Sequence, residues 1–104
     1  MTRHGFKMKL KPGNQAEYKR RHDEIWPELV ALLRAHGLRD YHIFHDEETD
    51  ILFAVQHRTD DATPDELPED PLMKRWFAHM GDIMETDESG APVMTPLVEV
   101  FHMD

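Results

Sequence analysis

The chain has 104 residues, 39% hydrophobic and 32% charged, which is an ordinary composition for one globular domain covering residues 1–104. Its net charge of −9 argues against a nucleic acid or an anionic membrane as partner. The absence of cysteine excludes disulfides and a thiol nucleophile. No segment approaches the roughly 20 apolar residues of a membrane span, so we expect a cytoplasmic protein.

Residues 3–10 predict a half-buried strand, because Phe6, Met8 and Leu10 alternate with polar residues. The dipeptide at 12–13 is Pro-Gly and predicts a turn. Asn14 follows as a candidate helix N-cap, and Glu17 stands at the spacing of a capping box. A helix is therefore predicted to begin at Asn14.

This helix is expected to run to about His36, where Gly37 can supply a left-handed stop. Pro27 lies inside it and cannot donate a backbone hydrogen bond to the carbonyl of Asp23. We therefore expect a kink or a brief break at this point, with the proline ring facing outward.

The second half of the chain predicts two strands, a helix and a final strand. Residues 39–45 and 51–57 form a predicted hairpin around a polar turn, and the acidic, proline-rich residues 59–71 predict a solvated loop. Asp70 can cap a second helix that opens on Pro71 and repeats apolar residues to position 84. After a loop at 85–96, residues 97–103 predict the last strand.

The order strand, helix, strand, strand, helix, strand is that of the α+β ferredoxin-like fold, with both helices on one face of a four-stranded antiparallel sheet. The other face should be polar if water covers it. Strands 51–57 and 97–103 instead carry apolar residues on both sides. We therefore expect a homodimer that packs sheet against sheet.

The segment 17–29 carries the main candidates for chemistry. At about 100° per residue, one helix face collects an apolar stripe that also contains a phenol and an imidazole: Tyr18, His22, Ile25, Trp26 and Leu29. Burial penalises such polar groups unless they find partners. They are either core residues satisfied by hydrogen bonds or an acid–base pair at the floor of a pocket, and helical geometry alone leaves both interpretations open.

Three further aromatic residues are candidates. Tyr41 shares a strand face with Ile43 and is either a core tyrosine or a ligand contact. Trp76 and Phe77 belong to an apolar helical stripe, which usually means core, although flat aromatic walls also bind sugars. The eight histidines show no metal-ligand spacing, so we expect neither a metal nor another cofactor.

The run formed by Tyr18, residues 20–22 (Arg-Arg-His) and residues 25–29 (Ile-Trp-Pro-Glu-Leu) resembles the first helix of the L-rhamnose mutarotase family. The resemblance extends from Phe6 through residues 99–101. It implies a dimeric α+β barrel and an aldose 1-epimerase that interconverts the α and β anomers of L-rhamnose or a related deoxy sugar by acid–base ring opening.

The resemblance also implies roles for single residues. His22 would protonate the ring oxygen, and Tyr18 and Tyr41 would bind sugar hydroxyls. Trp76 and Phe77 match an aromatic pair that contacts the sugar, although the family more often has Trp at the second position. No cofactor is implied, and the identity of the preferred monosaccharide and of the proton-transfer partner of His22 is left open.

Two other functions suit the same fold. One is a cofactor-free, monooxygenase-like enzyme, which would need a pocket for a large planar aromatic compound. The other is a non-catalytic, dimeric ligand-binding protein in which His22 is a satisfied core residue. Binding of pyranoses rather than flat aromatics, and a pH–rate profile controlled by His22, distinguish the mutarotase from both.

Overall fold

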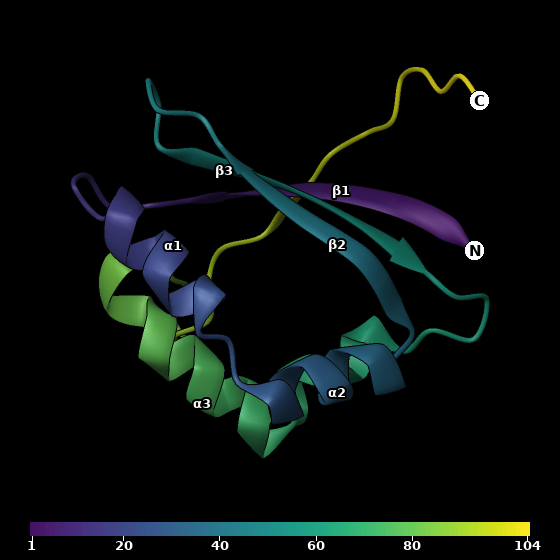
Figure 1. Ribbon diagram of the computed structural model, residues 1–104, viewed down its shortest axis with the longest axis horizontal. Coiled ribbons are helices and arrows are strands. Elements are labelled where there is room, and N and C mark those ends of the chain that lie inside the picture. Colours follow the sequence, from purple (N-terminus) through teal and green to yellow (C-terminus); the bar gives the residue numbers. More distant parts are fainter.

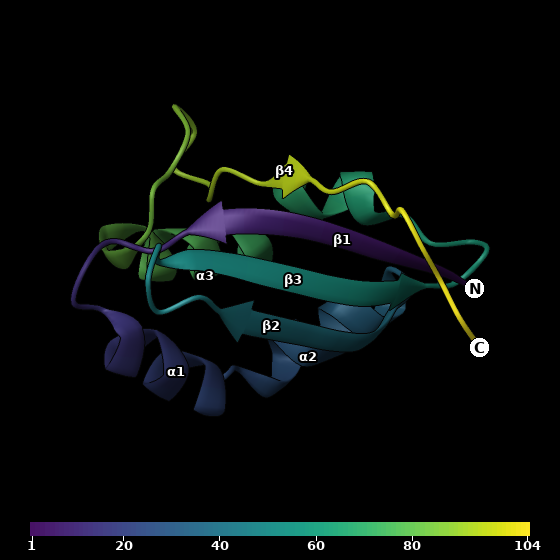
Figure 2. The same ribbon diagram turned by 90° about the horizontal axis from the view of Figure 1, so that it is seen from above.

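A computed structural model of residues 1–104 shows an antiparallel sheet of four strands in the order β2-β3-β1-β4. The strands are β1 (Thr2–Lys9), β2 (Leu38–His45), β3 (Ile51–Arg58) and the short β4 (Thr95–Pro96). The helices α1 (Gln15–Asp23), α2 (Pro27–Ala35) and α3 (Pro71–Met80) all lie on one side of this sheet (Figures 1 and 2). The predicted ferredoxin-like α+β fold is confirmed.

The core lies between the sheet and the three helices. In the register of the sheet, Phe6 pairs with Ala54 and Met8 with Leu52, and all four side chains are buried on the helix-facing side. The outward-pointing residues between them are charged on β1 but include the exposed Phe53 on β3. The period of two that predicted β1 therefore also identifies its buried face, whereas β3 carries apolar residues on both faces.

The predicted interruption at Pro27 is a complete break between two helices. Trp26 is extended (φ −65°, ψ 128°), because a residue before proline is driven out of the helical region. Pro27 then opens α2 at its first position, where the missing N–H costs nothing. α2 ends at the predicted stop, since Gly37 adopts a φ of +90°. None of these helices has the length and apolar character required to cross a bilayer.

The predicted capping box at the start of α1 is wrong. The Asn14 side chain makes no bond to the helix and instead donates its amide to the carbonyls of Lys11 and Pro12. The carboxylate of Glu17 accepts hydrogen bonds from Arg20 and Arg21. Two guanidinium donors compete better for a carboxylate than one backbone N–H does.

The second cap is confirmed, because Asp70 accepts a hydrogen bond of 2.8 Å from the backbone N–H of Leu72. The predicted solvated loop before it is only partly correct. It contains a short 3₁₀ helix, η1 (Pro64–Glu69), that buries Leu67 in the core. α3 is likewise followed by a 3₁₀ turn, η2 (Gly81–Ile83), which ends the predicted helix before position 84.

The predicted final strand at 97–103 is wrong. Pairing with β1 is confined to Thr95 and Pro96 and to one further bond from the Leu97 N–H to the Gly5 carbonyl. Residues 97–104, here called the C-terminal tail, then leave the sheet on the side away from the helices (Figure 1). The edge of β1 from Thr2 to His4 stays unpaired on this side, so the strand-like pattern at 97–103 was not sufficient to extend the sheet. The exposed apolar side chains of the tail are Leu97, Val98, Val100, Phe101 and Met103.

Substitution of Gly37 tests the packing at the end of α2, and Gly13 serves as the control. Gly37 and Gly13 both have a positive φ, but a Cβ at Gly37 would lie 2.7 Å from the Cα of Ala62, whereas nothing lies within 4 Å of one at Gly13. We expect Gly13→Ala to lower the free energy of unfolding by about 1–2 kcal/mol from backbone strain alone. Gly37→Ala should cost a further ~1–3 kcal/mol, because the Ala62 backbone must move. Urea unfolding of both variants measures the difference, and equal losses would contradict the close packing.

Candidate active site

Three aromatic side chains from two helices meet at the inner face of α1. The rings of Tyr18 and His22 are stacked with centroids 4.3 Å apart. The indole of Trp76, from α3, meets the His22 ring edge-on at 5.4 Å and an interplanar angle of 87°. Trp26, from the break between α1 and α2, packs against Trp76 at 5.1 Å. The imidazole is therefore enclosed by aromatic surface on at least two sides.

The hydrogen bond of His22 fixes which ring nitrogen is free. Nδ1 lies 3.1 Å from the backbone carbonyl of Tyr18. A carbonyl can only accept, so Nδ1 carries the proton and the neutral ring has its lone pair on Nε2. Burial lowers the pKa of His22 below its ordinary value, against smaller opposite effects of the Tyr18 carbonyl and Asp23. At neutral pH, Nε2 is therefore a proton acceptor.

Tyr41 reaches the same space from the sheet. The pairing of β2 with β3 is irregular between Arg39 and His42, and Asp40 has a φ of +44° within this bulge. Bulges re-aim side chains, and the Tyr41 ring lies edge-on to Phe6 at 6.3 Å. Burial of its hydroxyl raises the pKa of Tyr41 to about 12, against smaller effects of nearby Arg58 and Gln56.

The hydroxyl of Tyr18 is also protonated. Burial raises its pKa well above the ordinary value for tyrosine, and the proximity of Tyr41 adds to this effect. Both phenols therefore remain hydrogen-bond donors over the whole physiological pH range.

One cavity joins all the predicted side chains: Tyr18, His22, Tyr41, Trp76 and Phe77. Phe77 is partly buried and packs against the core beside Trp76. The cavity has a volume of about 1330 Å³ and extends as far as the C-terminal tail, so only part of it borders these five residues. The structure therefore brings these five residues to one cavity, and their functional roles stay predictions.

Two polar residues of this cavity escaped the sequence analysis. Gln56 is 3% exposed and follows Leu52 and Ala54 on the inner face of β3. Its side-chain oxygen accepts a 2.8 Å hydrogen bond from Nε of Arg58, the next inward residue. The sequence could have predicted the position of Gln56, because the period of two places residue 56 on the same inward face as Leu52 and Ala54.

The remaining polar clusters do not resemble a metal site. No group of three or more His, Asp or Glu side chains is arranged to hold an ion. His42 and His45 each bind one carboxylate, at 2.9 Å from Asp40 and 3.0 Å from Asp50 respectively. Beside the aromatic walls, the imidazole of His22 and the phenols of Tyr18 and Tyr41 can support acid–base chemistry on a neutral, partly apolar ligand.

Fold and cavity together define an α+β protein equipped for acid–base catalysis, and comparisons with known proteins narrow the class. A sequence model described as "L-rhamnose mutarotase" matches residues 3–103. The chain is 57% identical over 103 residues to the L-rhamnose mutarotase of Jannaschia sp. (strain CCS1), covering 99% of both chains. It is also 57% identical over 101 residues to that of Mesorhizobium japonicum, covering 97% of this chain and 96% of the relative.

The crystal structure of an L-rhamnose mutarotase from Formosa agariphila agrees over the full length of both chains, with 44% identity and a TM-score of 0.92. The chain belongs to the L-rhamnose mutarotase family. The resemblance seen in the segment 17–29 is thereby confirmed.

The position of Trp76 against His22 yields a test that needs no substrate. In an NMR titration of the ring protons, His22 should titrate below pH 6.5, and Trp76→Ala should raise its pKa toward 6.5 by admitting water. Trp26→Ala is the matched control, because this indole packs on Trp76 and His79. An unchanged His22 pKa in the Trp76 variant would show that the indole does not desolvate the imidazole.

Proposed function

We propose that this protein is an aldose mutarotase that interconverts the α and β anomers of L-rhamnose or a closely related 6-deoxy sugar, with residues 1–104 as its single domain. The observation that carries the proposal is the free Nε2 of a partly buried His22 in an aromatic cavity, in a chain of the L-rhamnose mutarotase family. A cytoplasmic location stays a prediction from the sequence.

The reaction requires two proton transfers and no redox step. A base removes the proton of the anomeric hydroxyl while an acid protonates the ring oxygen, and the bond between the anomeric carbon and the ring oxygen breaks. The open-chain aldehyde rotates about its bond to C2. Reclosure on the other face returns both protons and gives the other anomer.

Neutral His22 is suited to begin this sequence as the base. The resemblance implied that His22 first donates a proton, but the lowered pKa leaves Nε2 unprotonated at neutral pH. It therefore accepts the anomeric proton during ring opening, and the resulting imidazolium returns a proton on closure. A tyrosine hydroxyl (Tyr18 or Tyr41) or a bound water supplies the proton for the ring oxygen, since both phenols remain protonated.

The aromatic residues Trp76 and Phe77 are suited to contact the apolar C–H surface of a deoxy sugar. Trp76 and Phe77 present apolar surface to the cavity, and a pyranose with a 6-methyl group offers C–H faces that favour such a wall. Phe77 keeps the apolar surface but has no indole N–H. Any sugar hydroxyl that a second indole would bind must find another partner here.

The activity is tested by saturation-transfer NMR between the α and β anomeric protons of L-rhamnose. We expect His22→Ala to reduce the catalysed exchange about 10²–10⁴-fold, because general acid–base catalysis supplies factors of this size. His79→Ala is the matched control, since His79 touches Trp76 but does not line the cavity, and its exchange rate should stay within threefold. Catalysis that survives His22→Ala would place the acid–base group elsewhere.

The pH profile tests the protonation state. The active ring is neutral, so kcat/KM should be maximal above the lowered pKa of His22 and fall as the pH drops through it, with a midpoint below 6.5. A profile that rises on acidification would require a protonated His22 in the free enzyme and would overturn the order of proton transfers.

We further propose that the working form is a homodimer joined through the outer sheet face and the C-terminal tail. Phe44 and Phe53 are cross-strand neighbours on the outer side of the sheet and are 61% and 36% exposed. The tail adds Val100 and Phe101, which are more exposed still. Together they form an apolar surface on one side of the molecule that a second copy can cover.

Oligomeric state in sedimentation experiments tests the dimer. Phe44→Glu places a charge on the outer sheet face and should weaken self-association at least tenfold. Ala78→Glu introduces the same charge at an exposed position of α3 in the helix layer and should leave association unchanged. A wild-type chain that sediments as a monomer at micromolar concentration would refute the dimer.

A further inference from the structure

Helix α1 holds the imidazole of His22 but has little apolar packing of its own. Tyr18 is its only buried residue. The break at Pro27 also separates α1 from α2, so the second helix does not hold the first one in line. Some other contact must fix α1 against α3, because the cavity depends on the 5.4 Å contact between His22 and Trp76.

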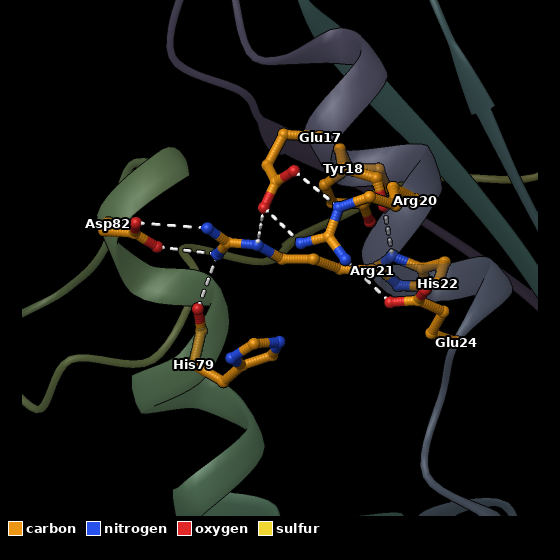
Figure 3. Close-up of polar contacts among 8 residues, drawn as sticks. All are labelled: Glu17, Tyr18, Arg20, Arg21, His22, Glu24, His79 and Asp82. Atoms are coloured by element: carbon orange, nitrogen blue, oxygen red, sulfur yellow. Dashed lines mark hydrogen bonds and ion pairs between the residues drawn. The ribbon is translucent and has the colours of Figure 1, made fainter.

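Arg21 makes that contact (Figure 3). Its Nη1 donates to the backbone carbonyl of His79 at 2.6 Å and to Oδ1 of Asp82 at 2.7 Å, and its Nη2 donates to Oδ2 of Asp82 at 3.2 Å. Its Nε donates to Oε2 of Glu17, one turn back on α1, at 2.8 Å. The bonds to His79 and Asp82 are the only side-chain hydrogen bonds that join α1 to α3 and η2.

The guanidinium of Arg21 is shielded from water, whereas its partner Asp82 is 66% exposed. The Arg21 side chain is only 11% exposed. The His79 carbonyl belongs to the last turn of α3, where carbonyls lack partners within the helix and a positive charge is favourable. The planar fork of arginine matches the Asp82 carboxylate with two donors, which a lysine ammonium cannot do.

The ionic partners keep their charge at any pH at which the enzyme would work. Hydrogen bonds from Arg20 and Arg21 lower the pKa of Glu17 to about 2, and the bond from Arg21 lowers that of Asp82. The clamp formed by Glu17, Arg21 and Asp82 therefore stays charged when His22 titrates. Removing the clamp should not change the pH dependence that His22 causes.

We propose that Arg21 is a positioning residue, which sets the angle and distance of α1 so that the imidazole of His22 lies correctly against Trp76 and the sugar. Arg21 and His22 are consecutive, so about 100° of helix turn separates them. Arg21 points to α3 and η2 while His22 points into the cavity, and any slide or rotation of α1 moves both. The inference rests on the proposed mutarotase function.

The experiment compares Arg21→Lys with Arg20→Lys. Arg20 is the matched control, because it also binds Glu17 but has its other side-chain partner, Glu24, at the end of the same helix. At saturating L-rhamnose, Arg21→Lys should slow anomer exchange about 10–100-fold with KM within threefold, since displacements near 1 Å cost up to about 10²-fold. The midpoint of the pH profile should be the same as in the wild type, because His22 still determines it. Arg20→Lys should remain within twofold of wild type.

A second measurement does not depend on activity. The ring protons of His22 lie beside the Tyr18 and Trp76 rings, so ring currents displace their NMR shifts even without sugar. Arg21→Lys should move these shifts toward those of a free histidine, and Arg20→Lys should leave them in place. If Arg21→Lys does not fold, Asp82→Asn removes the ionic partner and should shift them in the same direction.

The outcomes separate the two proposals. A folded wild-type chain without catalysis on L-rhamnose or related deoxy sugars would refute the proposed function. The NMR comparison of Arg21→Lys with Arg20→Lys would then still test whether Arg21 positions His22. An active wild type with full activity and unchanged His22 shifts in Arg21→Lys would overturn the positioning role. Equal impairment by Arg20→Lys would also overturn it, because a general loss of helix stability would then explain both.

Discussion

The break imposed by Trp26 and Pro27 is the constraint on which the helix layer depends. A continuous helix would keep the apolar face of segment 17–29 on one straight line. The extended Trp26 instead lets α1 and α2 take different directions over the sheet (Figure 1). The Trp26 indole packs against Trp76. Because α2 does not continue α1, contacts with other elements must hold α1 in place. The same proline that ends the helix thus creates the need for a polar link to α3.

Two opposing effects set the chemistry of His22. Desolvation among aromatic rings disfavours the imidazolium, while the Tyr18 carbonyl stabilises a protonated Nδ1. The carbonyl also fixes the tautomer, so that the free lone pair is on Nε2. Desolvation is the larger effect, which makes the group a base near neutrality. An exposed histidine on the same helix would lack both the lowered pKa and the aromatic wall.

Periodicity in the sequence predicted three strands and the buried face of β1, and the conformational preferences of single residues predicted the break at Pro27 and the cap at Asp70. They failed where the outcome depends on tertiary competition. Glu17 left its predicted cap for two arginines, and only the bulge at Asp40 explains how Tyr41 is aimed. The roles of single site residues came from family resemblance, since spacing alone did not distinguish a catalytic His22 from a core histidine.

The unpaired tail adds exposed apolar surface to the outer side of the sheet. Only 17 of 104 residues are buried, while at least four large apolar side chains of the tail face solvent. Covering four such side chains would yield on the order of 6–12 kcal/mol. Association itself costs about 4–15 kcal/mol, a range that overlaps this gain, so the tail alone leaves little net free energy for association. A stable dimer must add the face around Phe44 and Phe53, which ties the proposed assembly to the sheet that carries Tyr41 on its opposite side.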